Sequence, residues 1–409
     1  MRRGEGGLKV HNVLPPFDHH SSDHLDLWIA QTDAVRVEGP VAWTPANGGH
    51  WLVVGYAAVK AAALDWRTFS SFHDVTGECP AAQGIGIPPL AFPLILSESD
   101  PPLSSQRRKL ELPHFRTAMI RRWEPVVQAN VEASLSSVGP VACADLFTDF
   151  AMPVVAKTTL ELVGVNMDGW HEFTLAVHEG GQGIGADPTG DMERVHSMLR
   201  DLARERRRQP RSDIVSALVG GEVAGQLLSD EEVVSMLSAL VLGGFDTTAA
   251  LVTSALIWLS DNRQDHDRLL SDPTLLQNAV EEFLRFFPSA IGVGRSVMRD
   301  VELGGRALAT GDRVFLSWAA ANRDPAVFED PHEVRLARPN AARHLSFGVG
   351  GHHCLGADLA RLIAAISIRT VLQRLPDYRV DRTGLVRYAS PGVVVGWSKV
   401  PARFTPVSV

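Results

Sequence analysis

The sequence predicts a mainly α-helical protein with a small β portion. Helical periodicity dominates from residue 103 onward. Strand and turn patterns are limited to roughly residues 40–60, 289–319 and 385–405. No linker rich in Pro, Gly or Ser and no block of like charges divides the 409 residues. We therefore expect residues 1–409 to form a single domain.

The composition is that of a globular protein, with 45% apolar and 21% charged residues. The net charge of -8 is spread along the chain, so nucleic acid is not an expected partner. Cys79, Cys143 and Cys354 are odd in number and far apart, which argues against a disulfide framework and favours a reducing cytoplasm. The first residues contain no apolar run of the kind that directs export.

In the first hundred residues, short apolar runs alternate with turn residues. Residues 53–56 are typical of a strand, and residues 56–65 of a helix. Residues 71–99 contain seven Gly and Pro breakers, which predicts a long loop. Long loops in compact domains are often binding elements.

Residues 233–259 carry a single charge, Asp246, and are long enough to cross a bilayer. A central Asp costs about 2.5 to 3.5 kcal/mol on insertion scales, and Thr247 and Thr248 follow it. We therefore expect a helix buried in protein rather than a membrane span. The capping-box pattern from Ser229 to Glu232 predicts where this helix begins.

A second helix is predicted to begin at Asp272-Pro273 and to stop at Pro288. Residues 289–319 return to strands and turns, and residues 321–353 show no clear period. A further helix is expected after Cys354, through Leu375. Short strands such as residues 393–397 follow it.

The densest motif surrounds one cysteine, in the run Phe347-Gly348-Val349-Gly350-Gly351-His352-His353-Cys354-Leu355-Gly356. Glycines let the backbone approach a flat ligand closely and point N–H groups at the sulfur, which suits a thiolate metal ligand. An inert buried cysteine would not need these glycines. A zinc site would need a second ligand pair at the usual spacing.

This loop resembles the ligand loop of the cytochrome P-450 family, and the resemblance covers nearly the whole chain from about residue 41. It implies the cytochrome P-450 fold, with haem b between a long central helix and this loop and with O2 as co-substrate. Cys354 would be the iron ligand. Phe347, Gly348, Gly350 and Gly356 would contact the haem.

The resemblance also selects a pair of charges on the second predicted helix. Glu282 and Arg285 lie three residues apart and share a helix face. In the family, an arginine at the position of Arg338 completes a three-way ion pair that locks the haem loop. Val334 stands where the family usually has an aromatic residue, which would weaken packing there.

Inside the long helix, Gly243, Gly244, Asp246 and Thr247 are poor choices for stability and indicate a functional break. A hydroxyl bonded to a backbone carbonyl can open such a helix. By resemblance, Thr247 bonds iron-bound dioxygen and Asp246 relays protons. The alternative is a polar break against a neighbouring helix.

Cations are expected on the two haem carboxylates. Resemblance places Arg108 there, joined by Arg295 and His352, because cationic donors make charge-assisted hydrogen bonds with carboxylates. Many relatives carry His or Gln at the position of Ser104, so that contact would be shorter or lost.

The run at residues 43–51 and the Glu78-Cys79-Pro80 segment resemble the camphor-hydroxylase branch, but Phe92 falls where that branch has its substrate-binding tyrosine. An apolar or aromatic substrate is therefore expected. The predicted pocket consists of Phe92, Leu240, Gly243, Gly244, Ser289, Val293 and Val394.

Three functions are compatible with these motifs. The leading one is O2-dependent hydroxylation or other oxidation of a secondary metabolite, with two electrons from a ferredoxin and its reductase. The second is oxidative coupling of an aromatic metabolite such as an indole-containing cyclodipeptide, and the third is a haem-binding sensor or carrier. A basic group on residues 107–122 is either a docking patch for an acidic electron donor or a solvated face.

Overall fold

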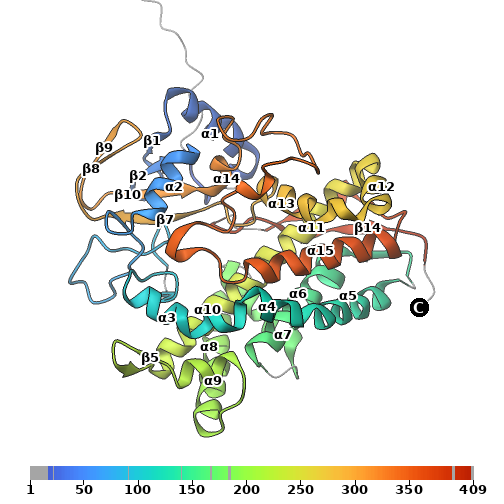
Figure 1. Cartoon of the computed structure of the whole chain (residues 1–409), viewed down its shortest axis with the longest axis horizontal. Coiled ribbons are helices and arrows are strands. Elements are labelled where there is room, and N and C mark those ends of the chain that lie inside the picture. The colour runs from blue at the N-terminus through green and yellow to red at the C-terminus, as the bar shows by residue number, and fades with distance from the viewer. Residues whose placement is uncertain are drawn as a thin grey trace, which may run out of the picture.

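The computed structural model describes residues 17–406 apart from residues 22, 91, 140, 166–167, 183–185 and 389–391. Helices make up most of this part of the chain, and strands form a smaller portion gathered mainly on one side (Figure 1). The predicted fold class is confirmed.

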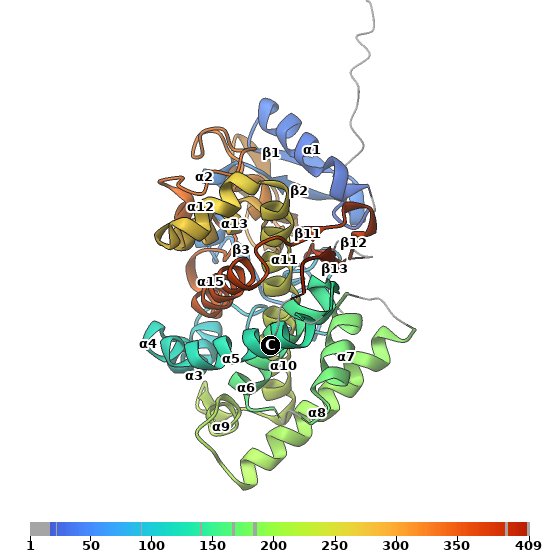
Figure 2. The ribbon, with the colours of Figure 1, turned by 90° about the vertical axis from the view of Figure 1, so that its right-hand side faces the viewer.

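The helices form the larger part of the molecule. In the view turned by 90°, α10 and α11 run end to end through the centre of the molecule, and α3, α4 and α15 lie on one side of them (Figure 2). In chain order, the helices are α1 (His24–Glu38), α2 (Tyr56–Leu64), α3 (Leu103–Phe115), α4 (Thr117–Ile120), α5 (Glu124–Val138), α6 (Met152–Val163), α7 (Trp170–Gln182), α8 (Pro188–Arg208), α9 (Ile214–Val219), α10 (Asp230–Gly244), α11 (Asp246–Asp261), α12 (Arg263–Ser271), α13 (Leu276–Phe286), α14 (Trp318–Ala321) and α15 (Ala357–Arg374).

The strands form one five-stranded sheet and several small ones. The large sheet has the order β1-β2-β10-β7-β3, in which β2 and β10 are parallel and the other neighbours antiparallel. The strands are β1 (Val41–Thr44), β2 (His50–Val53), β3 (Phe69–Ser70), β4 (Cys143–Asp145), β5 (Glu222–Val223), β6 (Gln226–Leu227), β7 (Gly292–Val297), β8 (Val301–Leu303), β9 (Arg306–Leu308), β10 (Arg313–Ser317), β11 (Arg379–Val380), β12 (Val386–Arg387), β13 (Trp397–Lys399) and β14 (Pro401–Arg403).

Two predicted helix starts are confirmed. Ser229 Oγ accepts the Glu232 N–H at 3.2 Å, and Glu232 Oε2 accepts the Ser229 N–H at 3.0 Å, so the capping box opens α10. Asp272 accepts the Thr274 N–H at 3.1 Å and opens a short 3-10 turn, which α13 continues from Leu276 to Phe286. Caps of this kind satisfy N–H groups that have no partner within the helix.

Two predicted boundaries are wrong. The strand predicted at residues 53–56 is β2, which ends at Val53, because Tyr56 already begins α2. The segment 393–397 makes one isolated bridge, from Val394 to Ala290, and strand β13 begins only at Trp397. The helix expected after Cys354 is confirmed, since α15 begins at Ala357 once the loop has turned.

The long central helix is broken rather than continuous. Phe245 lies between α10 and α11 with φ −79° and ψ −79°, well away from the usual helical ψ. The residues Asp230–Asp261 are apolar and long enough to cross a membrane by length and composition, but 67% of the most apolar window is buried inside the protein. Such burial is typical of a core helix, as the sequence predicts.

The core lies on both sides of this broken helix. The larger cluster of buried apolar residues joins α5, α6, α10, α11, α13 and α15, and a smaller one fills the space beneath the five-stranded sheet. The central helix is therefore held from several directions. This rigid setting fixes the position of the residues at the break.

Candidate functional site

A cavity lies between the α10–α11 break and the loop that precedes α15. Its wall is mostly apolar, with a cysteine on one side and cationic side chains near the edge. The lining residues from these elements include Leu240, Gly243, Gly244, Thr247, Leu251, Ser289, Ala290, Val293, Phe347, Gly348, Cys354, Gly356, Ala360 and Ile363.

The break in the central helix is stabilised by side-chain hydroxyls. Thr247 Oγ1 donates to the Gly243 carbonyl at 2.6 Å, and Ser289 Oγ donates to the Thr247 carbonyl at 2.7 Å. Gly244 packs so closely against α6 that an added Cβ would lie 2.9 Å from Thr159 Cγ2. Hydroxyls that bond to helix carbonyls locally bend a helix. Thr247 and Ser289 therefore stabilise the break, and both of them line the cavity.

Asp246 does not line the cavity, although Thr247 does. Its side chain points to α7, where Oδ1 lies 2.6 Å from His178 Nδ1, and both residues are buried. Tyr388 donates its hydroxyl to the Asp246 carbonyl at 3.3 Å. Burial and then the charge of Asp246 raise the pKa of Tyr388, which stays protonated. Thr247 thus lines the cavity and Asp246 lies behind its wall, and the proton relay expected of Asp246 stays a prediction.

The loop that carries Cys354 depends on backbone geometry that glycine favours. Gly348 and Gly350 have φ values of +66° and +79°, which other residues rarely adopt. The Cys354 N–H donates to the Phe347 carbonyl at 2.8 Å and closes the turn. Gly350 faces α2 and does not line the cavity, because an added Cβ would lie 3.0 Å from Leu64 Cδ2.

Cys354 is exposed to the cavity, although it lies deep within the protein. Burial raises its pKa, against the lowering effect of the Gly356 N–H and of the charges of Arg108 and Arg361. A Cβ at Gly356 would lie 4.0 Å from Sγ. The sulfur thus faces open space with an N–H donor and two cations near it, which suits a thiolate bound to a metal.

Two arginines and a histidine gather at the edge of the cavity. Arg295 is buried, donates from Nη1 to the Gly294 carbonyl at 2.7 Å, and makes no ion pair with any described residue. Burial lowers its pKa to about 10, despite the charges of Asp100 and Glu98. Arg108 donates from Nη2 to the His353 carbonyl, and burial lowers its pKa also. Buried guanidinium groups without a carboxylate partner favour an anionic ligand.

His352 completes this set. Its Nε2 lies 2.9 Å from Ser71 Oγ, which donates in turn to Asp100 Oδ1 at 3.0 Å. In that arrangement the imidazole donates from Nε2 to Ser71. Burial, followed by the charge of Arg295, lowers the pKa of His352 to about 4. At neutral pH it is a neutral donor rather than a cation.

The residues present therefore fit a haem. A single sulfur ligand faces the cavity, the wall around it is apolar, and two arginines and a histidine lie where the carboxylates of a flat macrocycle would emerge. No group of three or more metal-binding side chains occurs among the described residues, so the donor set is not that of a zinc site.

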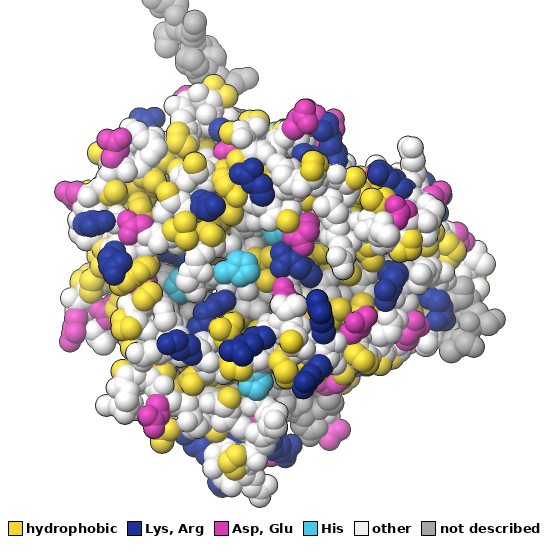
Figure 3. Space-filling view, viewed as in Figure 1, with side chains coloured by type: hydrophobic (Ala, Val, Ile, Leu, Met, Phe, Trp, Pro, Cys, Tyr) yellow, Lys and Arg dark blue, Asp and Glu magenta, His cyan; other side chains and the backbone are white. Residues whose placement is uncertain are grey.

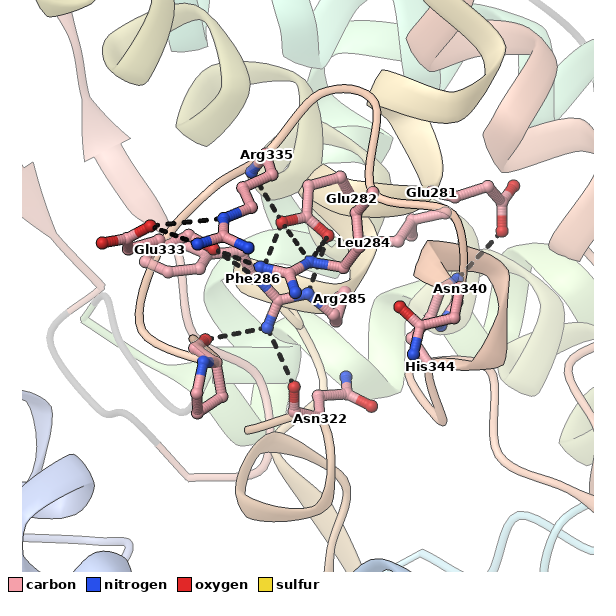
Figure 4. A network of polar contacts seen from close by, with 12 residues as sticks. Glu281, Glu282, Leu284, Arg285, Phe286, Asn322, Glu333, Arg335, Asn340 and His344 are labelled. Atoms are coloured by element: carbon pink, nitrogen blue, oxygen red, sulfur yellow. Dashed lines mark hydrogen bonds and ion pairs between the residues drawn. The ribbon is translucent and has the colours of Figure 1, made fainter. Parts of the chain in front are cut away.

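Three charged residues, Glu282, Arg285 and Arg338, form a buried network. Figure 4 shows Glu282 and Arg285 within it. Arg285 Nε lies 2.7 Å from Glu282 Oε2, and Arg338 Nε lies 2.9 Å from Glu282 Oε1. Arg285 also donates to the carbonyls of Asn322 and Glu333, at 3.0 Å and 2.7 Å. The structure thus brings together the three residues that the sequence selects, with one carboxylate shared by two guanidinium groups that also donate to backbone carbonyls.

A basic patch covers the face on which α3 and α4 lie. Lys109, Arg116, Arg121 and Arg122 are exposed there, and Figure 3 shows Lys and Arg side chains gathered over these helices beside a histidine. Arg107 is half-buried and pairs with Glu232 at 3.3 Å, so it is not part of the patch. The patch is local, since the chain as a whole carries a net charge of -8.

Two predicted pocket residues are misplaced. Phe92 is exposed and packs edge-on against His196 with ring centroids 5.1 Å apart, away from the cavity. Val394 is bridged to Ala290, and Ala290 lines the cavity whereas Val394 does not. Counting along a long loop fixes neither the direction of a side chain nor the register of a bridge.

Sequence reasoning also missed two buried residues. His178 meets Asp246 although the two are 68 positions apart, and nothing local in the sequence signals that contact. Glu111 on α3 is buried, with neither carboxyl oxygen hydrogen-bonded to a described residue. The only local signal is the spacing of Glu111, which lies three residues after Arg108 on the same face of α3.

Comparisons with known proteins all find one protein family. The model of the family described as Cytochrome P450 matches residues 191–376. "Cytochrome P450 monooxygenase PikC" from Streptomyces venezuelae is 32% identical over 90% of this chain and 89% of its own length. "6-deoxyerythronolide B hydroxylase" from Saccharopolyspora erythraea is 32% identical over 87% of this chain and 90% of its own length.

Solved structures agree with these relatives. The hydroxylase HmtN, described as a post-tailoring enzyme involved in himastatin biosynthesis, superimposes with a TM-score of 0.80, at 28% identity over 89% of this chain and 93% of its own. A mutant of P450 EryK in complex with erythromycin B gives a TM-score of 0.82, at 27% identity over 96% of this chain and 98% of its own.

Proposed function

This chain belongs to the cytochrome P450 family and is a haem b monooxygenase that uses O2, and we propose that it oxidises an apolar or aromatic small molecule of secondary metabolism. The observation that carries this proposal is the cavity, in which one thiol faces an apolar wall beneath the break in the central helix. Haem b, when bound, supplies an iron that activates O2 with two electrons delivered from outside the protein.

Cys354 is the proposed iron ligand. The Gly356 N–H and the charges of Arg108 and Arg361 favour its thiolate, and burial alone opposes it. Phe347, Gly348 and Gly356 line the cavity beside it. Gly350 acts indirectly in this proposal, by letting the loop lie close to α2.

Arg108, Arg295 and His352 would hold the carboxylates of the haem. The two guanidinium groups would give charge-assisted bonds. Neutral His352 has one N–H, which donates to Ser71 in this structure, so it would donate to a carboxylate in place of Ser71. Glu282, Arg285 and Arg338 would act as a structural lock for the cysteine loop. Their network joins α13 to residues 333–338, which precede that loop in the chain.

Thr247 and Asp246 would manage protons. The Thr247 hydroxyl is held at the cavity wall by its bond to Gly243. In this proposal the Thr247 hydroxyl accepts a proton that comes from Asp246 and donates a proton into the cavity. The buried Asp246 carboxylate is the only acid in the segment 239–251.

The substrate pocket would be formed by Leu240, Gly243, Gly244, Ser289 and Val293. Apolar contacts dominate this wall. Ser289 already donates its hydroxyl hydrogen to the Thr247 carbonyl, so its oxygen remains as an acceptor rather than a donor. An apolar or aromatic substrate that presents at most one donor fits this wall best.

The biosynthetic role follows from the relatives rather than from the pocket. HmtN is involved in himastatin biosynthesis, and a second relative is a 6-deoxyerythronolide B hydroxylase. Membership of the camphor-hydroxylase branch remains a proposal, as do a cytoplasmic location and the single-domain organisation. The basic patch of Lys109, Arg116, Arg121 and Arg122 would receive an acidic ferredoxin.

The mass of the product tests this function. The haem-loaded protein is incubated with a candidate metabolite, isotopically heavy O2, NADPH, a ferredoxin and its reductase. Hydroxylation adds one heavy oxygen atom to the product, whereas oxidative coupling removes two hydrogens and adds none. Candidate metabolites are first selected because they bind and shift the spin state of the haem iron. If none of them is converted when NADPH is supplied, a sensor or carrier is favoured.

A further inference from the structure

The long loop between β3 and α3 contributes Ile85 to the wall of the cavity. Ile85 is half-buried, and the glycines on either side of it, Gly84 and Gly86, are buried. Loops are usually more mobile than the helices and strands that they connect. A wall made from a loop therefore keeps its shape only where the loop backbone is fixed.

A buried arginine on β10 binds this part of the loop. Arg313 is 7% exposed, and its Nη2 donates to the carbonyls of Gly84 and Gly86 at 2.9 Å and 2.6 Å. Its Nη1 donates to Ser296 Oγ on β7 at 2.6 Å. Burial lowers the pKa of Arg313 to about 10, so the group is still a cation at neutral pH. One guanidinium group thus joins the sheet to the loop on both sides of Ile85.

A buried carboxylate holds the same backbone from within the loop. The side chain of Glu98 is fully buried, and its Oε1 accepts the Ile85 N–H at 2.9 Å. Its Oε2 accepts the Leu94 N–H at 2.9 Å and lies 3.3 Å from His73 Nδ1. Gly84 has a φ of +70°, and a Cβ added there would collide with Glu98 Oε1. Glycine at this position therefore lets the loop close around the carboxylate.

Strand β7 provides the remaining bond. The Gly294 N–H donates to the Ile85 carbonyl at 2.6 Å. A Cβ at Gly294 would lie 2.8 Å from Arg313 Nη2 and 2.9 Å from the Ile85 carbonyl oxygen, so the strand and the loop are in close contact. Both backbone polar groups of Ile85 are therefore satisfied, and two charged side chains hold the peptide groups around it. Hydrogen bonds to charged groups are among the stronger ones inside a protein.

With the substrate in this cavity, as the proposed function requires, we propose that Arg313 and Glu98 are positioning residues that fix Ile85 as a rigid, specificity-determining part of the substrate-binding wall. An apolar ligand that contacts Ile85 then meets a surface that is already ordered. Binding costs less conformational entropy when the surface is ordered beforehand. Loss of either charge lets the wall move and weakens the binding of ligands that contact it.

Three variants test the two charges and the contact that they support. Arg313→Met removes the guanidinium group but keeps a long apolar side chain. Glu98→Gln keeps the shape of the side chain but removes its charge and one of its two acceptors. Ile85→Ala removes the contact itself. Arg306→Met is the matched control, because Arg306 is an exposed arginine in the small sheet of β8 and β9.

The first readout is the affinity of the oxidised, haem-loaded protein for 4-phenylimidazole and for imidazole. An imidazole nitrogen that binds the iron shifts the absorption band of the haem, and only the phenyl ring extends to the wall. Ile85→Ala, Arg313→Met and Glu98→Gln should each weaken 4-phenylimidazole binding by about tenfold. Imidazole binding should change by less than about twofold, and Arg306→Met should match the unaltered protein with both probes.

A double variant shows whether Arg313 acts through Ile85. Changes at residues that act through one contact are not additive. Arg313→Met should therefore cause no further loss of 4-phenylimidazole affinity when it is added to Ile85→Ala. A full additional loss would contradict the proposal, since Arg313 would then affect the cavity by another route.

The second readout is amide hydrogen exchange of residues 82–87, which needs neither a ligand nor turnover. Exchange should be about tenfold faster in Arg313→Met and in Glu98→Gln, because hydrogen bonds to a charged group are lost. Ile85→Ala and Arg306→Met should leave it within about twofold of the unaltered protein. Unchanged exchange in Glu98→Gln and Arg313→Met would show that the charges do not fix the loop.

The remaining outcomes also decide the proposal. Faster exchange with unchanged 4-phenylimidazole affinity would make the two charges merely structural. Unchanged affinity in Ile85→Ala would remove this side chain from the wall. If Arg313→Met does not fold, Glu98→Gln supports the same double-variant comparison with Ile85→Ala. If imidazole causes no shift in the unaltered protein, the proposed haem function fails and the substrate-binding wall fails with it, whereas the exchange rates still report whether the charges fix the loop.

Discussion

Glu282 and Arg285, three residues apart on α13, form a fully buried two-point ion pair, with Nε–Oε2 and Nη2–Oε1 distances of 2.7 Å and 2.8 Å. Arg338 also pairs with Glu282, so one carboxylate is shared by two guanidinium groups. Removing the single negative charge therefore leaves two buried positive charges together.

Glu282→Gln should destabilise the protein strongly. Breaking a buried ion pair typically costs about 3–5 kcal/mol, because the remaining charge stays buried. Urea unfolding followed by circular dichroism measures the change in the free energy of unfolding. Glu231→Gln is the matched control, since Glu231 also makes a two-point pair, with Arg200, but is mostly exposed. Exposed pairs are screened and contribute about 1 kcal/mol or less. Equal losses in the two variants would contradict a buried lock.

Arg295→Met should lower haem affinity without destabilising the apoprotein. Arg295 is buried with no carboxylate partner among the described residues, so its charge costs free energy until an anion binds. A charge-assisted hydrogen bond lost from the complex weakens binding by roughly tenfold to a hundredfold. Haem titration measures the affinity, and urea unfolding measures the stability of the apoprotein. A parallel loss of both quantities would mean that Arg295 supports the fold rather than the haem.

Thr247→Ala should lower product formed per NADPH by about tenfold or more, since general acid–base groups contribute at least that much. Thr247→Ser keeps the hydroxyl and should restore most of the yield. Thr253 provides the control because its hydroxyl donates to the Ala249 carbonyl at 2.8 Å, one and a half turns along the same helix and away from the cavity. If Thr253→Ala causes the same loss, helix geometry and not the hydroxyl at the cavity is responsible.

Glu111 should make stability fall as the pH rises. Burial raises its pKa from 4.5 to about 8, although the charge of Arg108 opposes this. An acid with a raised pKa in the folded state contributes most below its unfolded value and loses that contribution as the pH rises to about 8. The free energy of unfolding should thus decrease by roughly 3 kcal/mol between pH 5 and pH 8 relative to Glu111→Gln. Parallel pH profiles for the two proteins would show that Glu111 is not buried as an acid.

Local patterns predicted the parts of the site that are close together in the chain. The cysteine loop spans ten residues, and Glu282 and Arg285 share one face of a helix, so their placement follows from helix geometry and glycine conformation. The start of α10 likewise follows from the capping box of Ser229 and Glu232. These features do not depend on distant packing.

The remaining parts depend on how distant elements pack. The direction of Asp246 is decided by His178 on α7 and by the break at Phe245, neither of which is visible in a single-helix pattern. Phe92 lies in a long loop, where its distance from Asp100 in sequence says nothing about which way its ring points. Such contacts are set by tertiary structure alone.

The most direct test of the central claim is the spectrum of the reduced, haem-loaded protein under carbon monoxide, compared with Cys354→Ala. A thiolate ligand from Cys354 predicts a band at about 450 nm that disappears in the variant, while Cys79→Ala and Cys143→Ala keep it. A band at about 420 nm in well-folded protein, with Cys354→Ala no different, would contradict Cys354 as the ligand.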